Sequence, residues 1–74
     1  MIASMIVEIE AEAEGSVLQA LDKIAGVSIY GIKDHQIVTV VEGETAMAVN
    51  NIVRGISSLE RIIGVYPVYA GEHA

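Results

Sequence analysis

Lys23-Ile24-Ala25-Gly26-Val27 is repeated later in the sequence, with substitutions at two positions, as Arg61-Ile62-Ile63-Gly64-Val65. Each copy follows a segment with helical periodicity and opens a segment that is typical of a β-strand. A further strand-like run precedes each helical segment, at residues 3–9 in the first half and residues 37–42 in the second. The chain is therefore predicted to consist of two similar halves, each made of a strand, a helix and a strand.

The length of 74 residues predicts one domain over residues 1–74. A domain of this size buries only about 60% of its unfolded surface, so its 53% hydrophobic composition predicts that some apolar surface lies at an interface. The absence of cysteine excludes disulfides and thiolate metal sites and favours a reducing compartment. With neither a secretory signal nor a run of about 18 apolar residues, the sequence predicts a cytoplasmic protein.

The net charge of −6 argues against binding to nucleic acid, because association would begin with repulsion from the phosphates. The sequence also lacks Phe and Trp, the residues that form stacking platforms in many RNA-binding sheets. The same charge permits a basic partner.

The first half begins with an alternating strand at residues 4–10, in which Met5, Val7 and Ile9 point to one side. Ser16 followed by Gln19 matches a capping box and predicts the start of the first helix. Gly26 suits the left-handed backbone position that follows a helix end. Residues 27–32 are predicted to form the second strand, with Val27, Ile29 and Gly31 on one face.

In the third strand, at residues 37–42, Thr39 is expected to lie on the solvent-exposed face. Val38 and Val40, which alternate with it, are therefore assigned to the core. Thr45 is predicted to cap the second helix, which should end near Ser57. Residues 62–69 then form the fourth strand, and Pro67 requires an edge position there because it cannot donate a ladder hydrogen bond. Residues 70–74 are expected to form a frayed tail.

The order β-α-β-β-α-β predicts an α+β fold, the ferredoxin-like sandwich. The four-stranded antiparallel sheet should have the strand order 4-1-3-2, with both helices on one face. The other face should remain open, and its expected residues are Ile6, Glu8, Glu10, Ser28, Tyr30, Ile37, Thr39, Val41, Tyr66 and Val68.

No constellation in the sequence predicts catalysis, a metal site or a cofactor site. His35 falls in a predicted turn and His73 in the predicted tail, so both are interpreted as exposed. Glutamates recur at every second position from residue 8 to residue 14. They have two interpretations: a solvated strand face running into a helix start, or an acidic rim that receives a basic peptide.

The apolar open face also has two interpretations. A stripe of exposed apolar residues on a sheet marks a partner surface, and a second copy of the chain, stacked sheet on sheet, would serve as well as a peptide. The edge strand that follows Gly26 is a further docking point for an extended peptide.

The sequence resembles a known family in three stretches: Gly26-Val27-Ser28-Ile29, Gln36-Ile37-Val38-Thr39-Val40-Val41-Glu42 and Leu59-Glu60-Arg61-Ile62-Ile63-Gly64-Val65-Tyr66-Pro67-Val68-Tyr69. They are similar to the NapD family, small cytoplasmic chaperones for the periplasmic nitrate reductase. One departure is Arg61, which stands where family members tend to have glycine.

The resemblance implies a non-enzymatic chaperone with a ferredoxin-like fold. Such proteins bind the twin-arginine signal peptide of the catalytic subunit on the sheet surface and hold back export while the molybdenum cofactor is inserted. The peptide-binding residues expected here are Ile6, Glu8, Glu10, Tyr30, Thr39, Val41 and Tyr66.

The rival hypothesis is a small-molecule-sensing regulatory domain of the ACT type. Gly15-Ser16-Val17-Leu18, followed by Gly26-Val27-Ser28-Ile29, is similar to an ACT-type loop, helix and second strand. Ala13 and Glu14 replace the usual Asp and Pro before Gly15. ACT-type modules usually attach to a catalytic or DNA-binding domain, and the 74 residues include none. A plain dimerisation module is the third alternative.

Overall fold

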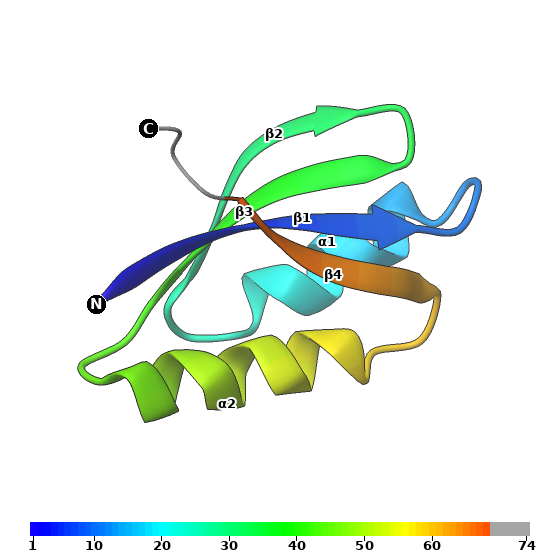
Figure 1. The fold of residues 1–74 in the computed structure, drawn as a ribbon. Helices are drawn as coiled ribbons and strands as arrows, with labels where there is room; N and C mark the ends of the chain where they lie inside the picture. The colour runs from blue at the N-terminus through cyan, green and yellow to red at the C-terminus, as the bar shows by residue number, and fades with distance from the viewer. Residues whose placement is uncertain (69–74) are drawn as a thin grey trace.

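The computed structural model describes residues 1–68 and contains a four-stranded antiparallel sheet with two helices on one face (Figure 1). The elements are β1 (Ile2–Ile9), α1 (Glu14–Asp22), β2 (Val27–Lys33), β3 (Gln36–Glu42), α2 (Ala46–Ser57) and β4 (Ile62–Val68). The strand order β2-β3-β1-β4 confirms the predicted ferredoxin-like topology and places Pro67 on an edge strand. Tyr69 and the predicted tail, residues 70–74, lie outside the described residues.

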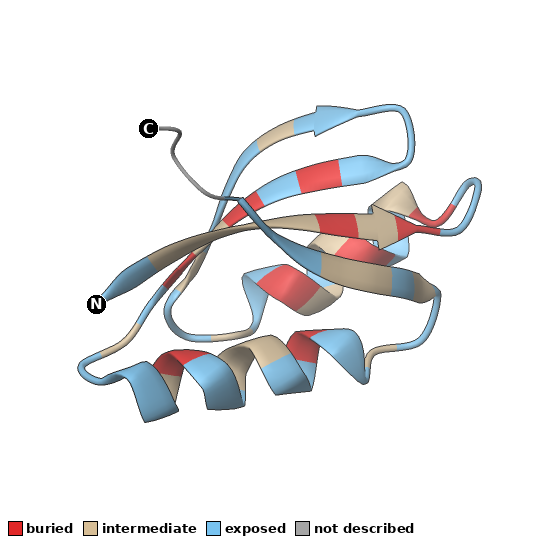
Figure 2. Cartoon of the chain, viewed as in Figure 1, coloured by how far each residue is buried: buried red, intermediate tan, exposed pale blue. Residues whose placement is uncertain are grey.

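The core lies between the sheet and the two helices (Figure 2). Both layers contribute its buried hydrophobic side chains: Val7, Ile9, Ala13, Val17, Leu21, Ile37, Val41, Val49 and Ile56. Full burial of a large aliphatic side chain contributes roughly 1.5–3 kcal/mol, so these few residues dominate the stability of a domain this small. The predicted alternation of β1 is confirmed, because Val7 and Ile9 belong to this set and Met5 packs against it.

The predicted faces of β3 are wrong. Ile37, Thr39 and Val41 are fully buried against the helices, whereas Val38 is 39% exposed on the opposite side. The pairing with β1 explains the arrangement, because Thr39 lies opposite Met5 on the core side of the sheet. The Thr39 hydroxyl donates a long hydrogen bond of 3.4 Å to the carbonyl oxygen of Ile37, so its burial leaves no unpaired hydroxyl.

A bulge interrupts β2 and changes which of its residues share a face. Ile29 pairs with Thr39, but Gly31, and not Tyr30, pairs with Val38. Tyr30 is the extra residue of the bulge, and the residues after it are shifted by one position relative to a regular strand. The sequence interpretation placed Gly31 with Ile29, and this is corrected, since Gly31 shares the face of Val38.

The two helices begin differently. Thr45 caps α2 as predicted, because its side-chain oxygen accepts a hydrogen bond of 3.0 Å from the Ala48 N–H. The predicted Ser16 cap is wrong, since α1 begins two residues earlier and Ser16 lies inside its first turn. There the Ser16 hydroxyl donates to the Ala13 carbonyl oxygen at 3.2 Å. Glu14 at the first helical position is favoured by the helix dipole.

The sequence repeat of residues 23–27 and 61–65 has a structural counterpart, but the structurally equivalent positions in the second half lie three residues earlier. Each helix is followed by a four-residue turn, at residues 23–26 after α1 and residues 58–61 after α2. Gly26 therefore corresponds to Arg61, and both have positive φ angles, 88° and 72°. Gly64 lies inside β4, as expected. A Cβ on Gly26 would lie 2.5 Å from the Glu42 carbonyl oxygen, so glycine is required there on two grounds.

Arg61 permits a test of this backbone strain, because its φ of 72° is unfavourable for any residue with a Cβ. Arg61→Gly and Arg61→Val both remove the side chain, so their difference isolates the backbone. We expect the Val variant to be less stable than the Gly variant by about 1–2 kcal/mol. The Gly variant should remain within about 1 kcal/mol of the parent protein. Urea denaturation measures both, and equal stabilities would contradict a left-handed residue at this position.

Candidate functional site

The open face is the side of the sheet that no helix covers. Paired residues on neighbouring strands share a face, and the register therefore assigns fourteen residues to it: Ile2, Ser4, Ile6, Glu8, Ser28, Gly31, Lys33, Gln36, Val38, Val40, Glu42, Gly64, Tyr66 and Val68. Tyr30 joins them, because alternation places it opposite in direction to the core-facing Ile29. Most of this surface is apolar. Glu8 and Glu42 are acidic side chains toward its opposite ends, and Lys33 is a basic side chain at the end of Glu8.

Three of the predicted peptide-binding residues come together at the β1–β4 pair. Ile6 lies directly opposite Tyr66, and Glu8 lies opposite Gly64. The Tyr66 hydroxyl donates to Glu8 Oε1 at 3.5 Å. Tyr66 is 50% exposed, so both its ring and the neighbouring carboxylate are accessible from the open face. Tyr30, the fourth predicted residue on this face, belongs to the far edge strand and is strongly exposed.

Two of the predicted peptide-binding residues do not lie on this face. Thr39 and Val41 are fully buried beneath the helices, so they cannot contact a peptide on the open side. Ile37, also expected there, is buried with them. Val38 and Val40 take their places, because their cross-strand partners Ile6 and Ser4 lie on the open side. The sequence holds no clear signal for this arrangement, because residues 37–41 are all β-branched and the two faces of the strand have similar hydrophobicity.

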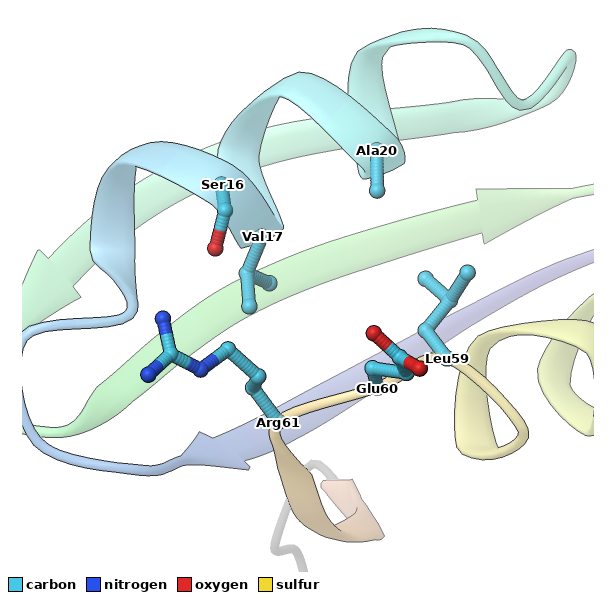
Figure 3. A pocket seen from close by; sticks show the side chains of 6 residues that line it. All are labelled: Ser16, Val17, Ala20, Leu59, Glu60 and Arg61. Carbon is cyan, nitrogen blue, oxygen red and sulfur yellow. The ribbon is translucent and has the colours of Figure 1, made fainter.

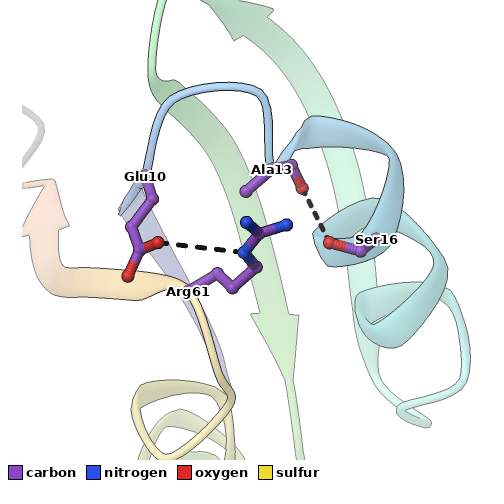
Figure 4. Close-up of polar contacts among 4 residues, drawn as sticks. All are labelled: Glu10, Ala13, Ser16 and Arg61. Atoms are coloured by element: carbon purple, nitrogen blue, oxygen red, sulfur yellow. Dashed lines mark hydrogen bonds and ion pairs between the residues drawn. The ribbon is translucent and has the colours of Figure 1, made fainter.

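Glu10 lies beyond the end of β1 and is paired with Arg61 (Figure 4). Its backbone N–H donates to the Arg61 carbonyl oxygen at 2.9 Å, and its Oε1 lies 3.8 Å from Arg61 Nε. Both side chains are about half exposed, and such pairs contribute only about 0–1 kcal/mol. The predicted placement of Glu10 on the open face is therefore corrected.

The glutamates after Glu8 do not form one continuous rim on the sheet. Glu12 lies in the turn after β1, with a φ of 64°, and Glu14 begins α1 in the helix layer. On the opposite end of the sheet, Glu42 pairs with Ile2. The acidic residues thus lie at separate places, and Glu8 and Glu42 lie on the open side at opposite ends of the sheet.

A hollow of about 570 Å³ lies in the helix layer, between α1 and the connection to β4 (Figure 3). Its lining mixes apolar and charged groups: Ser16, Val17, Ala20, Leu59, Glu60 and Arg61. Within residues 1–68, no three His, Asp or Glu side chains gather closely enough to hold a metal ion. His35 is exposed in the β2–β3 turn, as predicted, and His73 falls outside the described part of the chain.

Neither helix of the described chain is long and apolar enough to cross a membrane.

Comparisons with known proteins agree with this architecture. The profile of a family described as NapD protein matches residues 1–73. The fold is similar to the solution structure of the E. coli Tat proofreading chaperone protein NapD, with a TM-score of 0.88 and 19% sequence identity. That likeness covers 99% of this chain and 79% of the other. A comparison with curated proteins finds no match.

Proposed function

Because the chain belongs to the NapD family, we propose that it is a cytoplasmic, non-enzymatic chaperone that binds a twin-arginine signal peptide. The client is an exported molybdenum reductase subunit of the nitrate reductase type. Binding of its signal peptide holds back export while the cofactor is inserted into the client. The single observation that carries this proposal is the open face, an exposed apolar surface with a carboxylate toward each end, Glu8 and Glu42.

The apolar part of the open face suits the apolar segment that follows the arginines of such a signal. Val38, Tyr66 and Val68 are each between 39% and 50% exposed, on the side of the sheet opposite the helices. Ile6 lies between Val38 and Tyr66 on the central strand β1. Burial of these side chains beneath a peptide would supply most of the binding free energy, at roughly 25 cal/mol per Å² of apolar surface.

The charge of the chain suits the arginines. Glu8 lies at one end of the apolar surface, and the whole protein has a net charge of −6. Exposed ion pairs contribute about 0–1 kcal/mol each, so they add little to affinity. They instead raise the association rate and make it dependent on salt.

Calorimetric titration with a twin-arginine signal peptide tests the proposal. We expect a dissociation constant below about 100 µM, because several buried apolar side chains at roughly 1.5–3 kcal/mol each outweigh the cost of association. A variant peptide with Lys-Lys in place of the arginines should bind more weakly. Absence of binding at high micromolar concentration would overturn the chaperone function.

Two other outcomes would each replace the proposal. Tight binding of a free amino acid, with a change in oligomer size, would favour the sensor domain. A concentration-dependent dimer that excludes the peptide would assign the open face to a second copy of the chain. Analytical ultracentrifugation measures the oligomer size in both cases, with and without the free amino acid for the first outcome and with and without the peptide for the second.

A further inference from the structure

The Tyr66 side chain lies folded back over Gly64, two residues earlier on the same face of β4. A Cβ placed on Gly64 would lie 2.5 Å from Tyr66 Oη, 2.8 Å from Cζ and 3.0 Å from Cε2. The phenol ring therefore occupies the space that any other residue at position 64 would fill. Gly64 has no positive φ, so the backbone conformation does not require glycine there. The absence of a side chain at Gly64 instead leaves room for the Tyr66 ring.

This position brings the Tyr66 ring beside the Glu8 carboxylate. Glu8 is the cross-strand partner of Gly64, so a ring lying over the glycine extends toward it, and the Tyr66 hydroxyl reaches Oε1 at 3.5 Å. Among residues 1–68, no basic side chain lies within ion-pair distance of Glu8, and the ion pair of this part of the chain joins Glu10 to Arg61. The open face thus presents a carboxylate without a cation, next to an exposed aromatic ring.

An arginine side chain has the chemistry that fits this pair. Its guanidinium is planar, so it can donate to a carboxylate with its edge and stack on an aromatic ring with its face. A lysine ammonium is a compact point charge that pairs with the carboxylate but cannot stack in the same way. The arrangement therefore favours arginine over lysine through the ring, not through the charge.

We infer that Glu8 and Tyr66 form the seat for one arginine of the signal peptide, with Gly64 as the residue that lets the ring lie flat beside the carboxylate. The inference rests on the proposed function, because it names the groups that recognise the arginine at the same surface. Glu8 supplies the charge, and Tyr66 supplies the discrimination between arginine and lysine.

The test is the ratio of affinities for the Arg-Arg peptide and its Lys-Lys variant, measured calorimetrically on the full chain. The parent protein should prefer Arg-Arg by about tenfold, which corresponds to about 1.4 kcal/mol. Tyr66→Leu removes the ring, and Gly64→Ala displaces it through the close contact with the new methyl group. Both should lower the ratio to about one to threefold, while Tyr66→Phe, which keeps the ring and loses the bond to Glu8, should give an intermediate ratio.

Gly55→Ala is the matched control, because an added Cβ there meets no atom within 4 Å and Gly55 lies on α2, away from the open face. It should retain the parent ratio. A Tyr66→Leu variant that is folded and still prefers Arg-Arg tenfold would overturn the seat, as would an unchanged ratio in Gly64→Ala. Failure of the parent protein to bind either peptide would instead overturn the proposed function, so the two failures are distinguishable.

Discussion

Replacing Thr39 with lysine is expected to unfold the protein, whereas the same substitution at the adjacent Val38 is expected to leave it folded. Thr39 lies on β3 and is fully buried on the helix-covered face of the sheet, and Val38 is 39% exposed on the open face. A lysine at position 39 would bury an unpaired charge, which costs several kcal/mol. That cost is comparable with the total stability of a domain of this size, roughly 4–11 kcal/mol at 0.05–0.15 kcal/mol per residue.

At position 38 the aliphatic stem of lysine can lie along the apolar surface with its ammonium group in water. Thermal unfolding followed by circular dichroism measures both variants. Thr39→Val is the control, because it keeps the shape of the buried side chain without adding a charge, and it should remain folded. A folded Thr39→Lys together with an unfolded Val38→Lys would contradict the observed faces of β3.

The topology could be predicted from the sequence because its signals are local and consistent. Met5, Val7 and Ile9 alternate with residues that include Ser4, Glu8 and Glu10, which fixes the inner face of β1. Thr45 has the side chain of a helix cap, and Pro67 excludes a central position for β4. Each of these signals depends only on neighbouring residues, and each points to the same fold.

The faces of β3 could not be predicted in this way. Residues 37–41 are Ile-Val-Thr-Val-Val, all β-branched, so both faces of this strand have similar hydrophobicity. Threonine is polar by residue type, but it fits a core when its hydroxyl bonds within its own strand, as Thr39 does with Ile37. This one inversion placed the buried Thr39 and Val41 in the predicted binding site and left Val38 and Val40 out of it.

Other parts of the site depend on contacts between strands that no local pattern encodes. The bulge at Tyr30 shifts the end of β2 by one residue. The ring of Tyr66 lies over Gly64 only because glycine leaves space there, and it reaches Glu8 only through the register of β1 with β4. The shift of the repeat could not be predicted either, because Arg61 has the left-handed backbone conformation of Gly26 although it is not a glycine.

Val38→Lys is also expected to lower the affinity for the twin-arginine peptide by about 10- to 100-fold. The variant loses an apolar contact worth roughly 1.5–3 kcal/mol when fully buried. It also places a positive charge beside Ile6, the cross-strand partner of Val38, where it repels a cationic ligand. Calorimetric titration of the folded variant measures this loss.

The most direct test of binding at the open face compares Val38→Lys with Met47→Lys. Met47 is a 72% exposed apolar residue on α2, so the two variants lose an exposed apolar side chain and gain the same charge on different faces of the protein. We predict that Met47→Lys binds the twin-arginine peptide as the parent does, while Val38→Lys binds at least about tenfold more weakly. Equal affinities, or a loss confined to Met47→Lys, would contradict peptide binding on the open face.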